Sequence, residues 1–333
     1  MTTLPFLATS ESNAVNGTAF IEVDLKWLMV ASVILSFIGN CINIVVIPQL
    51  HEISTSSRVL FISRSSFELV VASLYAPSIH PAFVGQWVYS EWSCKLVGFL
   101  LVYSFGMIEV IVVLTTADRF FIIYEPFSYP LRATRSLTII TVVAASVFFC
   151  LFQIVLYQTA GDSWNIIRFR EYGVCMVDYS EPYFAPYTIA AMLFILCSAA
   201  IIVFVYVKMT CTVRKHVRQI GIQNQVIGQP HRAMEGAALI RSTAVSCVTA
   251  GLFIISWVPY SICEVITAVS GRPVSKFTLT VTARLTLCST WFNVFIYSLL
   301  NREFRRILMK AVRKAKDRVI DQVSTSSVGL AEV

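Results

Sequence analysis

Residues 94–120 read CKLVGFLLVYSFGMIEVIVVLTTADRF, and this stretch decides the fold. Between Leu96 and Ala117 it contains one charged residue, Glu109. A helix rises about 1.5 Å per residue, so roughly 20 apolar residues are enough to cross the hydrocarbon core of a bilayer. The stretch therefore predicts a membrane-spanning helix over residues 97–123.

Apolar runs of this length recur along the whole chain. Hydrophobic residues make up 56% of the 333 residues and charged residues 14%, with a mean hydropathy of +0.72. A water-soluble domain carries about 25% charged residues, so the composition excludes an ordinary soluble protein. Seven windows are long and apolar enough to cross a membrane: 27–47, 59–83, 97–123, 137–157, 184–207, 242–269 and 279–300. The sequence predicts an all-α membrane protein, a seven-transmembrane helix bundle.

Basic residues are distributed unevenly between the two sides of this bundle. The segments on the side of the N-terminus carry 6 Lys and Arg, and those on the side of the C-terminus carry 17. Because Lys and Arg accumulate in cytoplasmic loops, we expect a plasma-membrane protein with its N-terminus outside the cell and its C-terminus in the cytoplasm. The expected parts are an extracellular tail (1–26), the transmembrane domain (27–300) and an amphipathic helix with a cytoplasmic tail (301–333).

Two features of the outer segments agree with this orientation. Asn16-Gly17-Thr18 is a glycosylation sequon, although such tripeptides also occur by chance. Of the nine cysteines, Cys94 and Cys175 are the two in outer segments, where oxidation is permitted. We expect a disulfide between them, and the alternative is two free thiols.

Ionisable side chains within the spans are rare, and each one is a candidate for function because a charge in a bilayer is costly. They are Arg64, Glu68, Glu109, Asp118, Arg119, Glu264 and Arg284. Arg64 and Glu68 are four residues apart and share a helix face. They either form a self-neutralising ion pair, or Glu68 joins Asn40 and Asn293 in an interior polar cluster that rearranges between two states. Glu109 is either a protonated, hydrogen-bonded carboxyl or a pH-sensing switch.

Four short motifs follow one another along the spans. They are DRF at 118–120, SWVP at 256–259, NVFIY at 293–297 and NREFRR at 301–306. Gly39-Asn40 lies in the first span and Trp87 in the first outer loop, and Arg119 follows Cys94 by 25 residues. In this order and spacing, residues 27–316 resemble the rhodopsin-like (class A) G protein-coupled receptors.

The resemblance implies a receptor that binds an extracellular small-molecule or peptide ligand and activates a heterotrimeric G protein. Trp257 is expected at the floor of the ligand pocket, and a kink at Pro259 lets the inner half of the sixth helix move. Arg119, held by Asp118 in the inactive state, is then freed to face the G protein. The residues implied in coupling and activation are Asp118, Arg119, Phe120, Tyr206, Trp257, Pro259, Asn293 and Tyr297.

The chain also departs from the family pattern. Phe120 replaces the usual Tyr, Glu68 the usual Asp, Ser256 the usual Cys and Val294 the usual Pro. Proline kinks helices, so Val294 bears directly on how the seventh helix moves. We therefore also consider a coupling-deficient or decoy receptor. Relatives often carry an acid at the cytoplasmic start of the sixth helix that helps to lock the arginine. The nearest acid here, Glu235, lies about a turn too early, so we expect some basal activity.

The ligand itself is not identified by the sequence. Pocket candidates in the outer half of the bundle are Leu101, Phe105, Trp257, Tyr260, Glu264 and Arg284. Leu101 stands where amine receptors carry Asp, which disfavours a monoamine. Leu287 stands where visual pigments carry the retinal-binding Lys, which disfavours covalent retinal. Glu264 and Arg284 either recognise a charged ligand or pair with each other.

The segment after the seventh span is amphipathic. Residues 302–316 place four apolar side chains on one face, namely Phe304, Ile307, Leu308 and Val312. This pattern predicts a helix on the lipid surface. Ser324-Thr325-Ser326-Ser327 is either a phosphorylation site for arrestin binding or a soluble end.

Other classes of protein lack support in the sequence. The four His are scattered and there is no Gly-x-Ser-x-Gly motif, so we expect no enzyme, no metal site, no cofactor and no nucleic-acid partner. A seven-span transporter is a weaker alternative, because no internal repeat is visible.

Overall fold

Most of the chain is described by a computed structural model. Its backbone is described over residues 6–51, 53–159, 165–178, 185–227 and 230–329. Within these ranges, side chains are described except at 6–22, 216–242, 315 and 319–329. The candidate glycosylation site Asn16 falls outside the described side chains.

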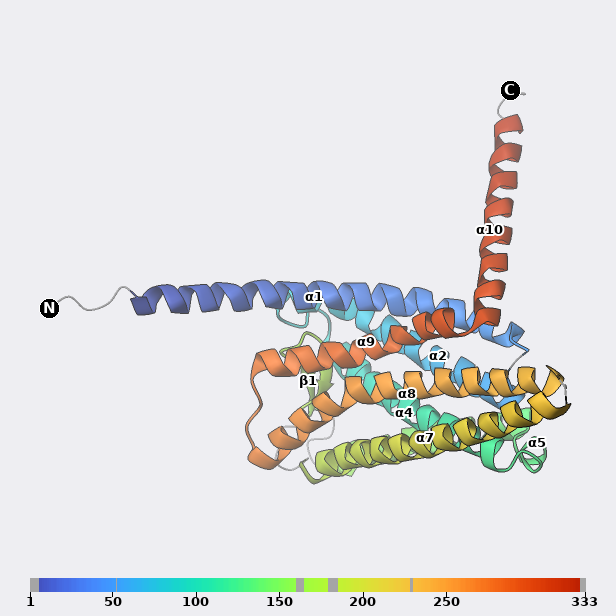
Figure 1. Ribbon diagram of the computed structural model, residues 1–333. Coiled ribbons are helices and arrows are strands. Elements are labelled where there is room, and N and C mark those ends of the chain that lie inside the picture. Colours follow the sequence, from blue (N-terminus) through green and yellow to red (C-terminus); the bar gives the residue numbers. More distant parts are fainter. Residues whose placement is uncertain (1–5, 52, 160–164, 179–184, 228–229, 330–333) are drawn as a thin grey trace.

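The described part consists of long helices and one small hairpin (Figure 1). Its elements are α1 (Phe6–Val46), η1 (Ile47–Gln49), α2 (Thr55–Tyr75), η2 (Ala76–Ser78), α3 (Ile79–Val84), α4 (Glu91–Tyr124), α5 (Tyr129–Arg132), α6 (Arg135–Thr159), β1 (Ile167–Phe169), β2 (Cys175–Val177), α7 (Ala185–Ile227), α8 (Pro230–Ser270), α9 (Lys276–Leu300) and α10 (Arg302–Gly329). Among the described residues, seven stretches are long and apolar enough to cross a membrane, and each overlaps one of the seven windows expected from hydropathy. The all-α, seven-transmembrane prediction is confirmed.

The spans pack as a closed bundle. α1 contacts α2 and α9, α2 contacts α4, α4 contacts α7, and α7 contacts α8, which returns to α9. α6 lies outside this ring against α2 and α4. In its most apolar window α6 is buried at only 11% of positions and α9 at 72%. α9 is therefore the span most enclosed by protein, and α6 the one most exposed to lipid.

Several helices begin at a serine that the sequence supplies at the required place. Ser54, Ser90 and Ser275 precede α2, α4 and α9, and each side-chain oxygen accepts a hydrogen bond from the backbone N–H three residues later. This capping satisfies one of the four N–H groups that a helix start leaves unpaired.

The helices extend beyond the hydropathy windows. α7 continues to Ile227, α8 starts at Pro230 and α1 starts at Phe6. The expected boundaries differ because hydropathy marks only the part of a helix suited to lipid, and a polar extension carries no such signal.

A hairpin that the sequence did not indicate closes one end of the bundle, here called the hairpin end. β1 and β2 pair antiparallel, with Ile167 opposite Val177 and Phe169 opposite Cys175, and both strands contact α4. Cys175 forms the expected disulfide with Cys94 at the start of α4, with Cα atoms 5.3 Å apart. Strands of three residues are too short to show the alternation of apolar and polar residues by which a strand is recognised in a sequence.

The opposite end, here called the Arg119 end, carries α10. This helix turns away from α9 and runs across the direction of the bundle (Figure 1). Phe304 is fully buried and its ring stacks on Tyr297, with centroids 5.7 Å apart. The first turn of α10 is thus anchored on α9. Ile307 and Leu308 are half-buried against the cluster that contains Phe304 and Tyr297, whereas Met309 and Val312 face outward.

Candidate functional site

Three polar side chains meet in the middle of the bundle. The Arg64 Nε donates to Glu68 Oε1 at 2.9 Å, and Asn293 Nδ2 of α9 donates to the same oxygen at 2.6 Å. Glu68 is 1% exposed. The ion pair and the interhelical link therefore both exist. A buried charge pair with an extra hydrogen bond joins α2 to α9.

Asn40 serves a neighbouring contact instead of joining Glu68. Its Nδ2 donates to the carbonyls of Ser36 and Thr290, both at 2.9 Å. Thr290 precedes Asn293 by one turn of α9, so Asn40 ties α1 to the helix that carries the cluster. In the described contacts, Asn40 reaches the helix of the cluster through the backbone carbonyl of Thr290 and makes no hydrogen bond with the side chains of Arg64, Glu68 or Asn293.

At the Arg119 end, Asp118 is held by two hydroxyl groups. Ser57 of α2 donates to Asp118 Oδ2 at 2.5 Å, and Tyr129 of α5 donates to Oδ1 at 2.7 Å. The Tyr129 hydroxyl also lies 2.7 Å from Ser54 Oγ. Burial raises the pKa of Tyr129 to about 12, so the phenol is a neutral donor at physiological pH.

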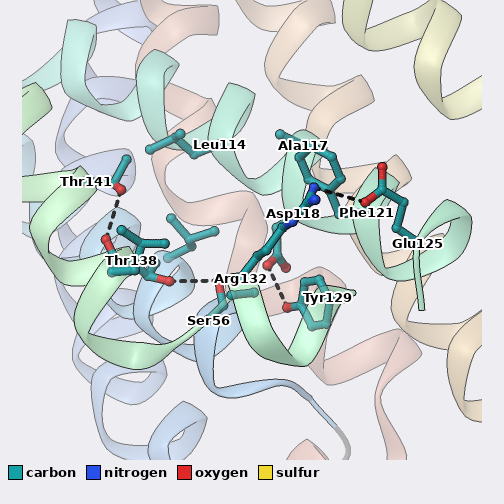
Figure 2. Close-up of a pocket in the computed structure, with 13 residues that line it drawn as sticks. Ser56, Leu114, Ala117, Asp118, Phe121, Glu125, Tyr129, Arg132, Thr138 and Thr141 are labelled. Carbon is teal, nitrogen blue, oxygen red and sulfur yellow. Dashed lines mark hydrogen bonds and ion pairs between the residues drawn. The ribbon is translucent and has the colours of Figure 1, made fainter. Parts of the chain in front are cut away.

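These contacts border a cavity of about 210 Å³ between α2, α4, α5 and α6 (Figure 2). Figure 2 shows Asp118 and Tyr129 facing each other at its rim, and Thr138 bonded to Ser56 across it. Sequence reasoning missed Ser57 and Tyr129 as partners of Asp118. A single hydroxyl residue in a loop or helix start has no pattern that would distinguish it from an ordinary polar position.

Arg119 is 2% exposed, and its guanidinium lies over the ring of Phe61, 5.5 Å from the centroid. It is one of the charges that act on Tyr206 and on Tyr297. Arg119 therefore lies within electrostatic reach of both tyrosines. Phe120 is half-buried on the adjacent position and stacks on Tyr124, 4.5 Å away.

An aromatic group surrounds Trp257 in the middle of α8. Its ring centroid lies 4.9 Å from Phe105 of α4 in an edge-to-face arrangement and 6.3 Å from Tyr260. Leu101, one turn before Phe105, is fully buried. Pro259 lies inside α8, where its ring removes a backbone hydrogen bond. Four of the expected pocket residues therefore gather around one bend-prone segment.

The hairpin lies over this aromatic group on the side of the hairpin end. The Tyr172 hydroxyl, in the turn between β1 and β2, lies 3.4 Å from that of Tyr260. Arg284 of α9 donates through Nη2 to the Tyr172 carbonyl at 2.6 Å and through Nε to the Leu25 carbonyl at 3.1 Å. Arg284 therefore fastens the hairpin turn and α1 to α9.

Glu264 and Arg284 do not pair with each other in the described contacts. Glu264 is fully buried, and the positive charge that acts on it is Arg170 of the hairpin, which itself pairs with Asp178. Of the two alternatives that the sequence left open, the bridge between these residues is absent from the described part.

Glu109, in the middle of α4, is 5% exposed and accepts a hydrogen bond from Ser198 of α7. This contact joins α4 to α7, one helical turn after Phe105 along α4. The Glu109 carboxyl is therefore hydrogen-bonded, as in the first of the two interpretations. That it is protonated stays a prediction.

Comparison with known proteins settles the family. The family model described as 7 transmembrane receptor (rhodopsin family) matches residues 39–297, more than half of the chain. The chain belongs to this family. It is therefore a multi-pass membrane protein of a family of G protein-coupled signalling receptors, which are not enzymes.

Individual relatives are distant and diverse. The chain is 18% identical to trace amine-associated receptor 4 of Rattus norvegicus, covering 88% of this chain and 86% of the relative. It is 24% identical to neuropeptide Y receptor type 1 of Xenopus laevis, with 84% and 77% covered. The crystal structure of squid rhodopsin superposes with a TM-score of 0.74 at 17% identity, covering 89% of this chain and 86% of that one. The receptor fold is shared, and the differing names of the relatives single out no ligand.

Proposed function

We propose that this receptor lies in the plasma membrane with its hairpin end outside the cell and its Arg119 end in the cytoplasm. In this orientation it binds an extracellular ligand beneath the hairpin and activates a heterotrimeric G protein. The excess of Lys and Arg in the segments next to the Arg119 end supports the orientation. The disulfide at the other end supports it too, because disulfides persist in oxidising surroundings.

The observation that carries the coupling proposal is the burial of Arg119 among Phe61, Tyr206 and Tyr297 at the proposed cytoplasmic end. Burying a guanidinium inside a membrane protein is costly, which makes such a residue a candidate for function. In the proposed mechanism the arrangement described here is the resting one. Movement of the inner half of α8 about Pro259 exposes Arg119 to the G protein.

The ligand acts by binding one of the two arrangements more tightly. It shifts their equilibrium by no more than its difference in affinity for them. Trp257 is suited to report its presence, since it contacts Phe105 of α4 and lies two residues before Pro259. In the same scheme the exposed apolar residues of α10 rest on the inner lipid surface, and the Ser324–Ser327 tail is offered to arrestin after phosphorylation.

The test is a G protein dissociation assay in cells that express the receptor at the surface. It is run without ligand and then with small-molecule and peptide libraries. We expect a ligand-free signal above vector control and a larger one with an agonist, both abolished by Arg119→Ala. Arg135→Ala is the matched control, because Arg135 is an exposed arginine at the same end. A signal that survives Arg119→Ala at equal surface expression contradicts the assigned role.

A coupling-deficient receptor is the second candidate, and Val294 favours it. α9 has no proline, and Val294 packs against Gly39 of α1 where relatives carry a helix-kinking residue. In that case the wild-type receptor gives no signal in the G protein dissociation assay with any ligand, and Val294→Pro raises the signal. Silence of both wild type and Val294→Pro would remove Val294 as the cause.

A further inference from the structure

A basic basin opens at the hairpin end, apart from the Trp257 group. Its volume is about 320 Å³, and it lies between α1, α3, the hairpin turn and α9. The charged and aromatic residues that line it are Lys26, Arg170, Glu171, Tyr172, Lys276 and Arg284. Four of these six carry a positive charge, and one carries a negative charge.

The positive charge of the basin is only partly compensated. Arg170 pairs with Asp178, which also lies 3.9 Å from Arg168. Glu171 is exposed at the rim. After these acids are counted, the lining still has a net positive charge. A cleft lined by positive charge focuses its electric field between low-dielectric walls, and this field attracts anions.

Arg284 supplies the buried element of the basin. It is 2% exposed, and two of its nitrogens already donate to the carbonyls of Leu25 and Tyr172. Its third nitrogen, Nη1, is buried with no hydrogen-bond partner among the described residues. An unsatisfied buried N–H costs about 1–3 kcal/mol, and more when the group is charged. An anion bound against Arg284 would supply the missing acceptor.

A glycine lets the hairpin turn pack directly against α3, which forms one wall of the basin. Gly173 has φ +82°, a conformation that favours glycine, and a Cβ there would lie 2.6 Å from the Cβ of Ala82. The turn can therefore lie directly on α3, with the Tyr172 carbonyl held by Arg284. The buried wall of the basin is made of Tyr172, Gly173 and Arg284, and Lys26 and Lys276 add positive charge to it.

We infer that the basin binds the acidic group of the extracellular ligand, a carboxylate or phosphate on a small organic molecule. The guanidinium of Arg284 is the anchor, and Lys26 and Lys276 are the outer cations. Phe169 and Tyr172 provide aromatic surface for the body of such a ligand. This inference deepens the proposed function and rests on its orientation, with the hairpin end outside the cell.

The experiment uses the purified full-length receptor in lipid nanodiscs, without G protein. Its melting temperature is measured against phenylacetate, succinate, phenyl phosphate and inorganic phosphate at constant ionic strength, with chloride as reference. We expect at least one organic anion to raise the melting temperature saturably. Comparing phenylacetate with phenyl phosphate assigns the acidic group, and inorganic phosphate alone shows whether the organic body contributes.

Variants make the assignment specific. The double variant Lys26→Gln/Lys276→Gln, which leaves the Arg284 contacts intact, is expected to weaken the apparent affinity about tenfold, and Arg284→Lys by about tenfold or more. Arg272→Gln is the matched control, because Arg272 is an exposed cation at the same end outside the basin lining. Absence of a saturable shift with all four anions, or an equal loss in Arg272→Gln, overturns the inference.

The outcome is separable from that of the proposed function. Anion binding that depends on Lys26 and Lys276, in a receptor that never releases a G protein, retains the basin and refutes the coupling proposal. A G protein signal that Arg119→Ala abolishes, in a receptor that binds none of the four anions, does the reverse.

Discussion

Tyr129 of the short helix α5 donates a hydrogen bond to the carboxylate of Asp118, eleven residues earlier in the chain. Ser57 of α2 donates to the other oxygen of the same carboxylate. One acid therefore holds three elements together next to Arg119. Family resemblance assigns Asp118 to Arg119, whereas the described contacts of its carboxylate are these two hydroxyl groups.

Tyr129→Phe is expected to destabilise the receptor. A hydrogen bond to a charged group contributes about 1.5–3 kcal/mol, and the substitution removes it while keeping the ring. We expect a lower melting temperature of the purified receptor. Tyr124→Phe is the control, since its hydroxyl contacts Thr212 on an exposed surface. Equal melting temperatures of Tyr129→Phe and wild type would contradict this role.

The same bond gives a pH dependence with a definite sign. The pKa of Tyr129 is raised from 10 to about 12 by burial, so the folded receptor favours the protonated phenol. The contribution of the protonated Tyr129 phenol to stability is complete below pH 10 and is lost as the pH rises toward 12. The difference in melting temperature between wild type and Tyr129→Phe should stay constant from pH 6 to about 9. A difference that shrinks within that range would argue against the assignment.

The Arg64–Glu68 pair predicts that one substitution costs more than two. Glu68→Leu leaves the Arg64 guanidinium buried without its acid, which costs about 3–5 kcal/mol in known buried pairs. Arg64→Leu/Glu68→Leu removes both charges, so its melting temperature should lie above that of Glu68→Leu alone. Thermal unfolding of the purified variants measures this. A double variant that is less stable than Glu68→Leu would mean that the two residues act independently.

The elements that the sequence predicted are those with a local or compositional signal. Seven apolar runs predict seven spans, because the thickness of the bilayer fixes their length. The four-residue separation of Arg64 and Glu68 predicts their contact, because it is one turn of a helix. Cys94 and Cys175 are predicted as partners by their shared compartment, and the structure contains that disulfide.

The contacts that the sequence could not predict involve partners with no signal of their own. Arg284 donates to two backbone carbonyls, which every residue possesses. Tyr129 and Ser57 reach Asp118 from a loop helix and a helix start, where hydroxyl residues are common. Such contacts follow from how the spans pack, and packing order is not encoded in the periodicity of any one span.

The disulfide predicts a selective effect of reduction. Cys94→Ser/Cys175→Ser frees the hairpin from α4, and loss of a native disulfide typically costs about 2–5 kcal/mol. We expect lower surface expression and a lower melting temperature, and dithiothreitol should reproduce the second effect in the wild type but have no such effect on the double variant. Cys211→Ser is the control, because Cys211 is exposed and unpaired on α7. Equal behaviour of the two variants would show that the disulfide contributes no stability.

Gly39 of α1 packs closely against Val294 of α9. A Cβ on Gly39 would lie 2.8 Å from Val294 Cγ1. Valine is stiff about its first side-chain torsion and cannot turn away freely. We expect Gly39→Ala to cost about 1–3 kcal/mol through overpacking, measured as a fall in melting temperature.

A double-mutant cycle distinguishes this clash from a general intolerance of α1. Val294→Ala removes the methyl groups that Gly39→Ala would meet, so the double variant should be more stable than the sum of the single effects predicts. Gly251→Ala is the control, because no side-chain or backbone atom lies within 4 Å of a Cβ there. Strict additivity of Gly39→Ala and Val294→Ala would show that Gly39 is constrained by something other than Val294. Val294 would then not be the residue that limits the size of the side chain at position 39.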